Sequence, residues 1–347
     1  MADRCRPGDT IFFDEIVLCL GCCKLVRYGI GEMANKKIVV VGSSNTDMII
    51  KAPRIPKPGE TVLGGQFSMA AGGKGAIQAV AAARAGGDVV FIARVGTDFF
   101  GERAIKSFSL DKIDASLISR DKEEPSGIAL VFVGEDGQNS IAVAAGANAK
   151  LSRKDIEKSE GAIAAADILL MQLEIPLDTV LAAAQIADAN GIRVILNPAP
   201  AQKLPPKLLK YISILTPNEF EAEVLTGIRI SDNRRAGAAA DSLLAQGVET
   251  VLITLGPRGA FLATKDIREL VPGFSVRAVD STGAGDVFCG ALAVALSENK
   301  PMWDSVTFAN AAAAISVTRL GAQPSIPRRN EIEKFLSSRN TATPQAR

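Results

Sequence analysis

The sequence predicts an α/β fold in which a mainly parallel sheet is covered by helices on both faces. From Lys37 onward, short runs of β-branched residues alternate with alanine-rich stretches of helical periodicity, a pattern typical of parallel sheets with crossover helices. The chain has 347 residues, 47% of them hydrophobic, which is enough to bury a large core in one domain with a small appendage. Each predicted strand ends at a polar or glycine-containing turn, and ligands of open α/β sheets bind at such strand ends.

The main-sheet strands are expected, in chain order, at residues 38–41, 89–93, 168–172, 193–196, 212–215 and 251–254. Helices are expected between them at 74–85, 177–189 and 218–226, because apolar residues recur there at helical spacing. These elements are assigned to one domain over residues 36–340. Residues 1–35 are expected to form a poorly ordered N-terminal extension, arising upstream of Met33 or from a misassigned start, and residues 341–347 a flexible tail.

Two stretches break the alternation and predict a small second sheet. Strands are expected at 46–51 and 60–68, and again at 127–133 and 139–143 around the turn 134–137, because these segments have strand and hairpin character. Such a sheet, formed by segments of about 45–70 and 126–146, is suited to act as a lid over the strand ends. An exposed apolar face on it would favour a homodimer.

The amino-acid composition limits the kinds of partner and of catalytic group that the protein can use. Lys and Arg total 39 against 38 Asp and Glu, a formal charge of +1, so bulk charge points to neither nucleic acid nor a membrane, and a small molecule is the expected partner. The chain has no histidine, which excludes an imidazole base and leaves proton transfer to carboxylates. The apolar stretch 11–20 is interrupted by Asp14 and Glu15 and is too short to span a membrane.

The cysteines are distributed unevenly. Four of the five lie within the first 23 residues, and Cys289 is the only one in the remainder, which excludes a disulfide framework for the main domain and fits a cytoplasmic protein. Cys19, Cys22 and Cys23 are spaced closely enough to suggest a metal or redox site. We favour a reading without metal, because thiolate zinc sites normally need a fourth ligand.

The strongest motif is the segment 280–286, Asp-Ser-Thr-Gly-Ala-Gly-Asp, which leads into a helix. Small residues at Gly283, Ala284 and Gly285 allow backbone N–H groups to point at an anion, and the helix N-terminus adds its positive end. Asp286 could then accept the proton of an attacking hydroxyl. Composition alone leaves equal room for a plain helix start, in which Asp286 only complements the helix dipole.

A second glycine cluster, Ala71 to Ala76, precedes another predicted helix and carries Lys74. It is not a Walker A loop, because Lys74 is followed by Gly75 rather than Ser or Thr. Gln78 breaks the dinucleotide fingerprint here and Phe288 breaks it in the other motif, so a nicotinamide dehydrogenase is disfavoured.

Polar residues at the strand ends, each also able to cap a helix, could hold several sugar hydroxyls: Asn45, Asp47, Glu174, Asn218 and Glu219.

From about residue 36 to 336 the order of these motifs resembles the ribokinase family of carbohydrate kinases, which also includes adenosine kinase and fructokinases. The resemblance covers about nine tenths of the chain. It is carried by the two glycine motifs, at 72–75 and 280–286, and by five further segments: 41–47, 170–174, 196–201, 216–219 and 321–325. It implies a ribokinase-like three-layer α/β/α domain with a small β-sheet lid.

The resemblance also implies an activity: ATP-dependent phosphorylation of D-ribose at the 5-hydroxyl, with Asp286 as general base and Mg²⁺ accompanying the phosphates. The implied sugar contacts are Asn45, Asp47, Gly73, Lys74, Gly75, Ile77, Glu174 and Asp286. The implied ATP contacts are Asn218, Thr254, Leu255, Gly256, Pro257, Arg258, Gly259, Gly285 and Asn310. A monovalent cation, usually K⁺, is implied at Asp280, Thr282, Ser316, Arg319, Gly321 and Ser325.

Two positions depart from the family pattern. Ile77 stands where the family motif has an Asn that contacts a sugar hydroxyl, and Asn310 stands where many members have His near the adenine. If Ile77 faces the sugar, one hydroxyl loses its partner at a cost of about 1–3 kcal/mol. Two alternatives therefore stay open at this point: a kinase for 2-deoxyribose, another furanose or a nucleoside, and a weakly active sugar-binding regulatory protein.

Overall fold

The computed structural model describes residues 10–13, 16–19, 37–136 and 138–340. Within the first 35 residues it forms an antiparallel hairpin of β1 (Thr10–Phe13) and β2 (Ile16–Cys19). Cys5, Cys22 and Cys23 lie outside the described residues, so the expectation about the cysteine group is not addressed. Residues 36–347 form a separate unit, which is considered from here on.

The main sheet of this unit has nine strands in the order β15-β14-β13-β12-β11-β10-β3-β6-β7. Pairing is parallel from β13 to β7, whereas β14 and β15 add antiparallel strands at one edge. In chain order the strands are β3 (Lys37–Val41), β6 (Asp88–Gly96), β7 (Ile118–Asp121), β10 (Ile168–Met171), β11 (Arg193–Leu196), β12 (Ile214–Leu215), β13 (Thr250–Thr254), β14 (Gly259–Ala263) and β15 (Arg268–Pro272).

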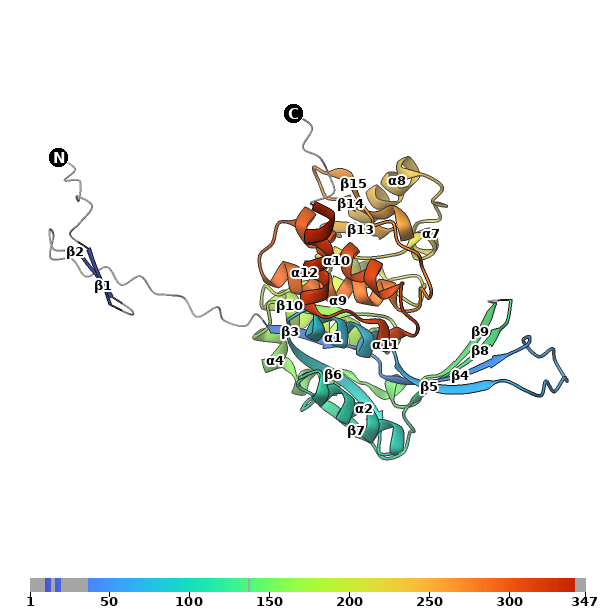
Figure 1. The fold of residues 1–347 in the computed structure, drawn as a ribbon. Helices are drawn as coiled ribbons and strands as arrows, with labels where there is room; N and C mark the ends of the chain where they lie inside the picture. Colours follow the sequence, from blue (N-terminus) through green and yellow to red (C-terminus); the bar gives the residue numbers. More distant parts are fainter. Residues whose placement is uncertain (1–9, 14–15, 20–36, 137, 341–347) are drawn as a thin grey trace. The chain divides into compact units, whose positions relative to one another are not determined.

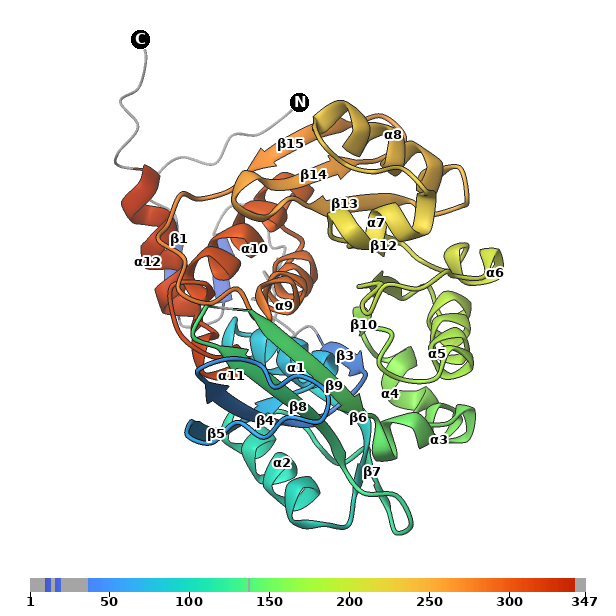
Figure 2. The same cartoon turned by 90° about the vertical axis from the view of Figure 1, so that its right-hand side faces the viewer.

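Helices cover both faces because the central strands are apolar on both sides. Ile38 and Val40 of β3 pack in one core, Val39 and Val41 pack in the other, and all four are fully buried. The first core is covered by α1 (Lys74–Arg84), α2 (Phe99–Leu110), α9 (Ala284–Ser297), α10 (Met302–Ser316), α11 (Ala322–Ser325) and α12 (Arg329–Asn340). The second is covered by α3 (Arg153–Lys158), α4 (Glu160–Ala164), α5 (Leu177–Ala189), α6 (Pro206–Leu209), α7 (Glu219–Thr226) and α8 (Asn233–Leu244). Figure 2 shows the two groups on opposite sides of the sheet, and the predicted three-layer fold is confirmed.

A second sheet of four strands, in the order β5-β4-β8-β9, extends away from the main sheet (Figure 1). Its strands are β4 (Asn45–Ala52), β5 (Gln66–Gly72), β8 (Gly127–Gly134) and β9 (Asn139–Ala144). The predicted small sheet is therefore present, although the strand expected at 60–68 begins only at Gln66. Gly64 and Gly65, with φ of 85° and 148°, place the preceding backbone in conformations that β-strands do not adopt.

The other strands and helices predicted from the sequence agree with the structure to within a few residues, with three exceptions. The strand expected at 212–215 is reduced to Ile214–Leu215, because the N–H of Ile212 still bonds to Leu209 at the end of α6. Residue 218 precedes its helix rather than belonging to it. Strands β7, β14 and β15 were not predicted. Among the described residues no helix is long and apolar enough to cross a membrane.

Candidate active site

Helices α1 and α9 begin side by side at the carboxyl ends of the central strands. Each is preceded by a glycine with positive φ, Gly73 at 88° and Gly283 at 74°, a conformation that favours glycine. The helices also approach closely because Gly290 of α9 has no side chain: a Cβ there would lie 2.6 Å from the carbonyl oxygen of Gln78. The two glycine motifs of the sequence are thus brought into one site.

Asp286 lies in the first turn of α9 and is 5% exposed. Its Oδ1 accepts a hydrogen bond from Gln78 Nε2 at 2.8 Å, and its Oδ2 lies 4.0 Å from Lys74 Nζ. Burial raises the pKa of Asp286 and the Glu174 carboxylate adds to the rise, whereas Lys74 and Gln78 oppose it. In return, Asp286 raises the pKa of Lys74. The site therefore holds a buried carboxyl whose pKa is raised, next to a lysine that stays charged. A carboxyl with a raised pKa is suited to act as a general base.

Glu174 and Asp47 form the polar part of the site. Glu174 Oε2 accepts hydrogen bonds from Ser43 Oγ at 2.5 Å and from the backbone N–H of Lys74 at 2.9 Å, so it ties the end of β10 to the start of α1. Burial, together with Glu174, raises the pKa of Asp47 to about 6. A Cβ on Gly72 would lie 2.1 Å from Asp47 Oδ1. The glycine thus leaves room for this carboxylate.

Two further residues of the predicted sugar site, Asn45 and Ile77, have side chains that are buried against other parts of the protein. The side chain of Asn45 is buried and its Oδ1 accepts a hydrogen bond from Asn148 Nδ2 at 2.8 Å. Ile77 is 6% exposed and belongs to the hydrophobic core. A Cβ on Gly283 would lie 3.5 Å from Ile77 Cγ2, so Ile77 packs against the loop at 283–285. Gly73, Lys74, Gly75 and Glu174 lie together at the start of α1.

A mostly apolar hollow of about 390 Å³ lies on the other side of the 283–285 loop. Six of the predicted ATP contacts line it: Thr254, Gly256, Pro257, Gly259, Gly285 and Asn310. Three do not. Leu255 is buried in the core, Arg258 pairs with Glu219 at 2.6 Å, and Asn218 caps α7 by accepting a bond from the N–H of Glu221.

Sequence reasoning missed the apolar walls of this hollow. They come from the segment after β15 and from the last turns of α10, namely Phe274, Val276, Ala278, Ala313, Ala314 and Val317. Isolated apolar residues of this kind carry no motif, and β15 itself was not predicted. The side chain of Asn310 is fixed by hydrogen bonds from its Nδ2 to the carbonyl oxygens of Val271 and Pro272.

The residues implied for a monovalent cation come from the segment before α9 and from the stretch between the end of α10 and the end of α11, and Asp280 joins the two. Asp280 Oδ1 accepts hydrogen bonds from the N–H and hydroxyl of Thr282, and Oδ2 accepts one from the N–H of Gly321 at 2.9 Å. Burial acts to raise the pKa of Asp280, but these bonds together lower it. Elsewhere in this region the Ser316 and Ser325 hydroxyls donate to backbone carbonyls, and Arg319 pairs with Glu331.

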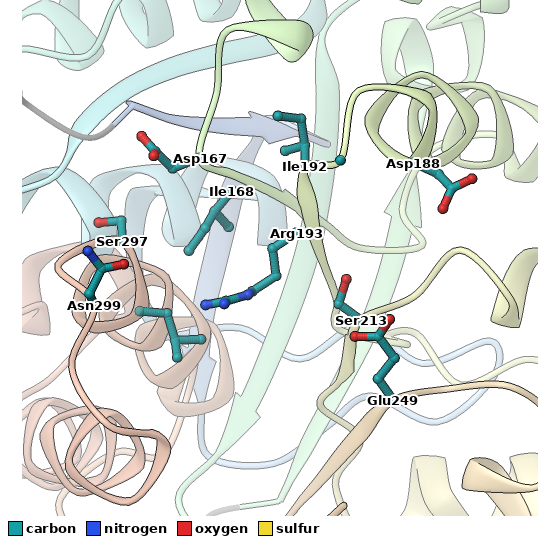
Figure 3. Close-up of a pocket in the computed structure, with 11 residues that line it drawn as sticks. Asp167, Ile168, Asp188, Ile192, Arg193, Ser213, Glu249, Ser297 and Asn299 are labelled. Atoms are coloured by element: carbon teal, nitrogen blue, oxygen red, sulfur yellow. The ribbon is translucent and has the colours of Figure 1, made fainter.

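A separate polar hollow of about 420 Å³ lies at the opposite, amino ends of the strands (Figure 3). Asp167, Arg193 and Glu249 are among its lining residues, and none of the predicted site residues is. Ligands of open α/β sheets bind at the carboxyl ends, so this hollow is set apart from the candidate site. No group of three His, Cys, Asp or Glu side chains in the described part of the chain is arranged to hold a metal ion.

Comparison with known proteins agrees with this geometry. Residues 35–329 match the model of the pfkB family carbohydrate kinases. The ribokinase of Haemophilus influenzae is 48% identical over 301 residues, covering 87% of this chain and 98% of the relative. A crystal structure of ribokinase from Thermotoga maritima is 41% identical with a TM-score of 0.81, covering 87% and 99% of the two chains.

A further solved structure is that of Arabidopsis thaliana ribokinase complexed with ribose and ATP. It is 34% identical to this chain, with a TM-score of 0.81, and the match covers 87% of this chain and 98% of that one. The family match spans the main domain up to residue 329, including both glycine motifs and the residues around Asp286. The chain therefore belongs to the pfkB family of carbohydrate kinases.

Proposed function

We propose that this chain transfers the γ-phosphoryl group of ATP to the 5-hydroxyl of D-ribose, giving ribose 5-phosphate and ADP. The observation that carries the proposal is the position of Asp286, at an anion-binding helix start between a group of carboxylates and an apolar hollow. Relatives with 48% and 41% identity are named ribokinase, and the Arabidopsis relative is complexed with ribose and ATP. ATP-dependent phosphorylation of ribose is the activity that fits all three features.

In the proposed reaction, Oδ2 of Asp286 accepts the proton of the 5-hydroxyl while the O5–Pγ bond forms and the bond from Pγ to the β-phosphate oxygen breaks, releasing ADP. The N–H groups of Gly283, Ala284 and Gly285 and the positive end of α9 stabilise the charge on the transferred group. Lys74, 4.0 Å from Asp286, adds a cation. The ATP base occupies the hollow next to Asn310, and Asn45, Asp47, Gly73, Lys74, Gly75 and Glu174 hold the sugar.

Mg²⁺ and K⁺ belong to the proposal as well. Mg²⁺ bound to the phosphates would neutralise their charge. The two segments joined by Asp280 suit K⁺, because they offer a carboxylate and backbone carbonyls, and carbonyl oxygens can replace the hydration shell of K⁺. There, Asp280 with the backbone oxygens of Thr282, Ser316, Arg319 and Gly321 and with Ser325 would hold the ion and order the loop that precedes α9.

The assay that tests the proposal is ADP release with ATP, Mg²⁺ and K⁺ on ribose, 2-deoxyribose and a panel of nucleosides. Asp286→Asn serves as the inactive control. We expect ribose to be phosphorylated fastest, in a reaction that depends on Asp286. Turnover of a nucleoside or of 2-deoxyribose alone would reassign the substrate, and no turnover on any of them would refute the kinase activity.

Sugar binding is expected to weaken below pH 6. Asp47 has a pKa raised to about 6, so it is ionised above that pH and becomes protonated as the pH falls through it. A neutral carboxyl loses one acceptor site for a sugar hydroxyl, and the Kd for ribose should then rise by up to about tenfold per pH unit. Calorimetry of ribose binding without ATP, from pH 5 to 8, measures this, and Asp47→Asn should flatten the dependence. A parent protein with flat binding would exclude Asp47 from the sugar site.

Ile77→Asn is expected to increase the preference for ribose over 2-deoxyribose by about tenfold, the effect of one added hydrogen bond in a buried site. Ile77 packs beside Gly283 at the anion-binding loop, which places an Asn there within reach of a bound sugar. The ratio of kcat/KM for the two sugars is the measurement. An unchanged ratio would mean that Ile77 has a packing role only.

We further propose a cytoplasmic homodimer that forms through the small sheet, with the sheet acting as a lid over the sugar. The pairs Ile50–Phe67 and Met48–Met69 place their side chains on one face, where Phe67 is 61% exposed. Leu130, opposite Met48, extends this apolar face. Contiguous exposed apolar surface of this kind marks interaction sites.

Phe67→Glu is expected to convert the dimer to a monomer, because it places a charge in the centre of this face. Gel filtration with light scattering at micromolar concentration is the measurement. Leu110→Glu is the matched control, since Leu110 is 83% exposed on α2, outside the small sheet. A parent protein that is strictly monomeric at that concentration would contradict the proposal.

A further inference from the structure

A chain of buried amide side chains lies behind Asp286. Gln172 Nε2 donates to Gln78 Oε1 at 2.7 Å, and Gln78 Nε2 donates to Asp286 Oδ1 at 2.8 Å and to Asn197 Oδ1 at 3.3 Å. Asn197 Nδ2 in turn donates to the carbonyl oxygen of Thr216 at 2.9 Å. Gln78 and Gln172 are fully buried and Asn197 is 6% exposed. Three neighbouring strands and α1 thus contribute to one hydrogen-bonded network that ends on Asp286.

The direction of every bond in this network follows from one backbone group. The carbonyl of Thr216 can only accept, so Asn197 must present its NH₂ to Thr216 and its oxygen to Gln78. Gln78 must then present its NH₂ toward Asn197 and Asp286. Its oxygen faces Gln172, which has to donate. Rotating any one amide by 180° would place two like groups against each other, so Gln78 can only be a donor to Asp286.

The network leaves one buried oxygen unpaired and requires a glycine next to it. Gln172 Oε1 is buried without a hydrogen-bond partner among the described residues, which is unfavourable. A Cβ on Gly42 would lie 2.0 Å from the same oxygen, so the residue beside it has to be glycine. An apolar side chain in place of Gln172 would avoid the unpaired buried oxygen. The presence of a polar side chain here instead indicates a functional role.

We propose that Gln78, held by Gln172 and Asn197, is a positioning residue that saturates Oδ1 of Asp286 and leaves Oδ2 as the oxygen that receives the substrate proton. This inference rests on the proposed role of Asp286 as base. Oδ2 is the oxygen nearest Lys74 Nζ, on the side where the substrate hydroxyl is expected. The network therefore fixes both the orientation of the base and the atom that reacts.

The same contact affects the ionisation of Asp286. The ionisable groups that act on or with Asp286 are Lys74 on α1, Glu174 after β10, Glu221 on α7 and Cys289 on α9. Burial and Glu174 raise the pKa of Asp286, and Lys74 and the hydrogen bond from Gln78 lower it. Burial also raises the pKa of Cys289 and of Glu221. Loss of the Gln78 donor should thus raise the pKa of Asp286 further, so that activity is lost at a higher pH as the solution is acidified.

Gln78→Met removes the donor at nearly constant volume and is the main test. We expect the acid limb of kcat to move upward by about one pH unit, and kcat at neutral pH to fall by about tenfold or more, as expected for a lost hydrogen bond to a charged group. Binding of ribose and ATP should change by less than threefold. The control is Thr179→Val on α5, which removes the buried bond from Thr179 Oγ1 to the carbonyl of Leu151 and should leave the pH profile unchanged.

Gln172→Met is the second variant: it removes the unpaired oxygen of Gln172 and leaves Gln78 Oε1 without its donor. It should shift the acid limb in the same direction by a smaller amount. A Gln78→Met protein whose kcat falls equally at every pH, or a Thr179→Val protein that shifts the limb as much, would overturn the proposal.

The titration of Asp286 can also be followed without turnover. Spectra of protein labelled with ¹³C at the aspartate carboxyl groups, minus those of Asp286→Asn, report the pKa of this residue directly. An upward shift in Gln78→Met would support the network even if ribose proved not to be the substrate. An unchanged pKa would refute it even in a fully active ribose kinase.

Discussion

Replacing Asp286 with Asn is expected to lower kcat by about 10³-fold while binding of ribose and ATP is retained. General-base catalysis by a positioned side chain contributes about 10² to 10⁴ in rate, and Asn cannot accept a proton. The substitution keeps the shape of the side chain, and its oxygen can still accept the bond that Gln78 donates to Oδ1. The loss should therefore appear in kcat rather than in KM.

The stability of Asp286→Asn separates a catalytic residue from a structural one. Burial raises the pKa of Asp286, which means that the folded state bears a cost for ionising it. A neutral Asn removes this cost, so the free energy of unfolding at pH 7 should be unchanged or higher. If Asp286 served only to complement the dipole of α9, the variant would instead lose about 0.5–1 kcal/mol and keep its activity.

ADP release and urea denaturation measure the two quantities on the same preparations. A kcat within tenfold of the parent protein would contradict the assignment of Asp286 as base. A large loss of stability together with lost activity would show that the carboxylate is needed for folding. The lower kcat would then be no evidence that Asp286 is the base.

The part of the site that could be predicted is the part encoded by short continuous motifs. The segments 72–75 and 280–286 specify a local backbone conformation by their glycines, and Gly73 and Gly283 do have the positive φ that such motifs require. Asp286 and Lys74 follow directly from these segments. The alternation of apolar strands with helices likewise predicted the three layers, because central strands such as β3 and β10 are buried on both faces.

What could not be predicted depends on contacts between distant segments. Gln78, Gln172 and Asn197 belong to different elements, and their sequence separations of 94 and 119 residues leave no local pattern. Phe274 and Val276 line the apolar hollow proposed for the nucleotide, although their own segment has neither helix nor strand. Strand β14 was missed because the alanine-containing run Gly259–Ala263 carries a weak strand signal and pairs only through tertiary structure.

The role of Ile77 shows how structure refines a prediction based on a motif. From the sequence, its place in the glycine motif suggested a direct contact with sugar. In the structure Ile77 is part of the core that includes α9 and packs against the loop at Gly283. We therefore expect Ile77 to act on the proposed sugar site through the position of the loop at 283–285 as well as through the missing hydrogen bond.

Gly75→Ala is expected to destabilise the protein by about 3 kcal/mol, in contrast to most substitutions of glycine by alanine inside helices. A Cβ at position 75 would lie 2.5 Å from the backbone nitrogen of Ser43 and 2.7 Å from Cα of Gly42. Both are backbone atoms at the end of β3, so no side chain can rotate away, and overpacking of this kind costs about 1–3 kcal/mol. The helix α1 has to move away from the strand to accept the methyl group.

The same movement should reduce kcat/KM by about 10²-fold, because α1 carries Lys74 and Gln78 and misplacement by about 1 Å has effects of this size. Gly237→Ala provides the matched control: its Cβ would lie 3.5 Å from Cζ of Phe261, an ordinary contact. Removing a glycine from the interior of α8 should stabilise the protein by about 0.5–1 kcal/mol. Urea denaturation of the two variants should thus give changes of opposite sign, and a Gly75→Ala protein as stable as Gly237→Ala would mean that α1 does not pack this closely on β3.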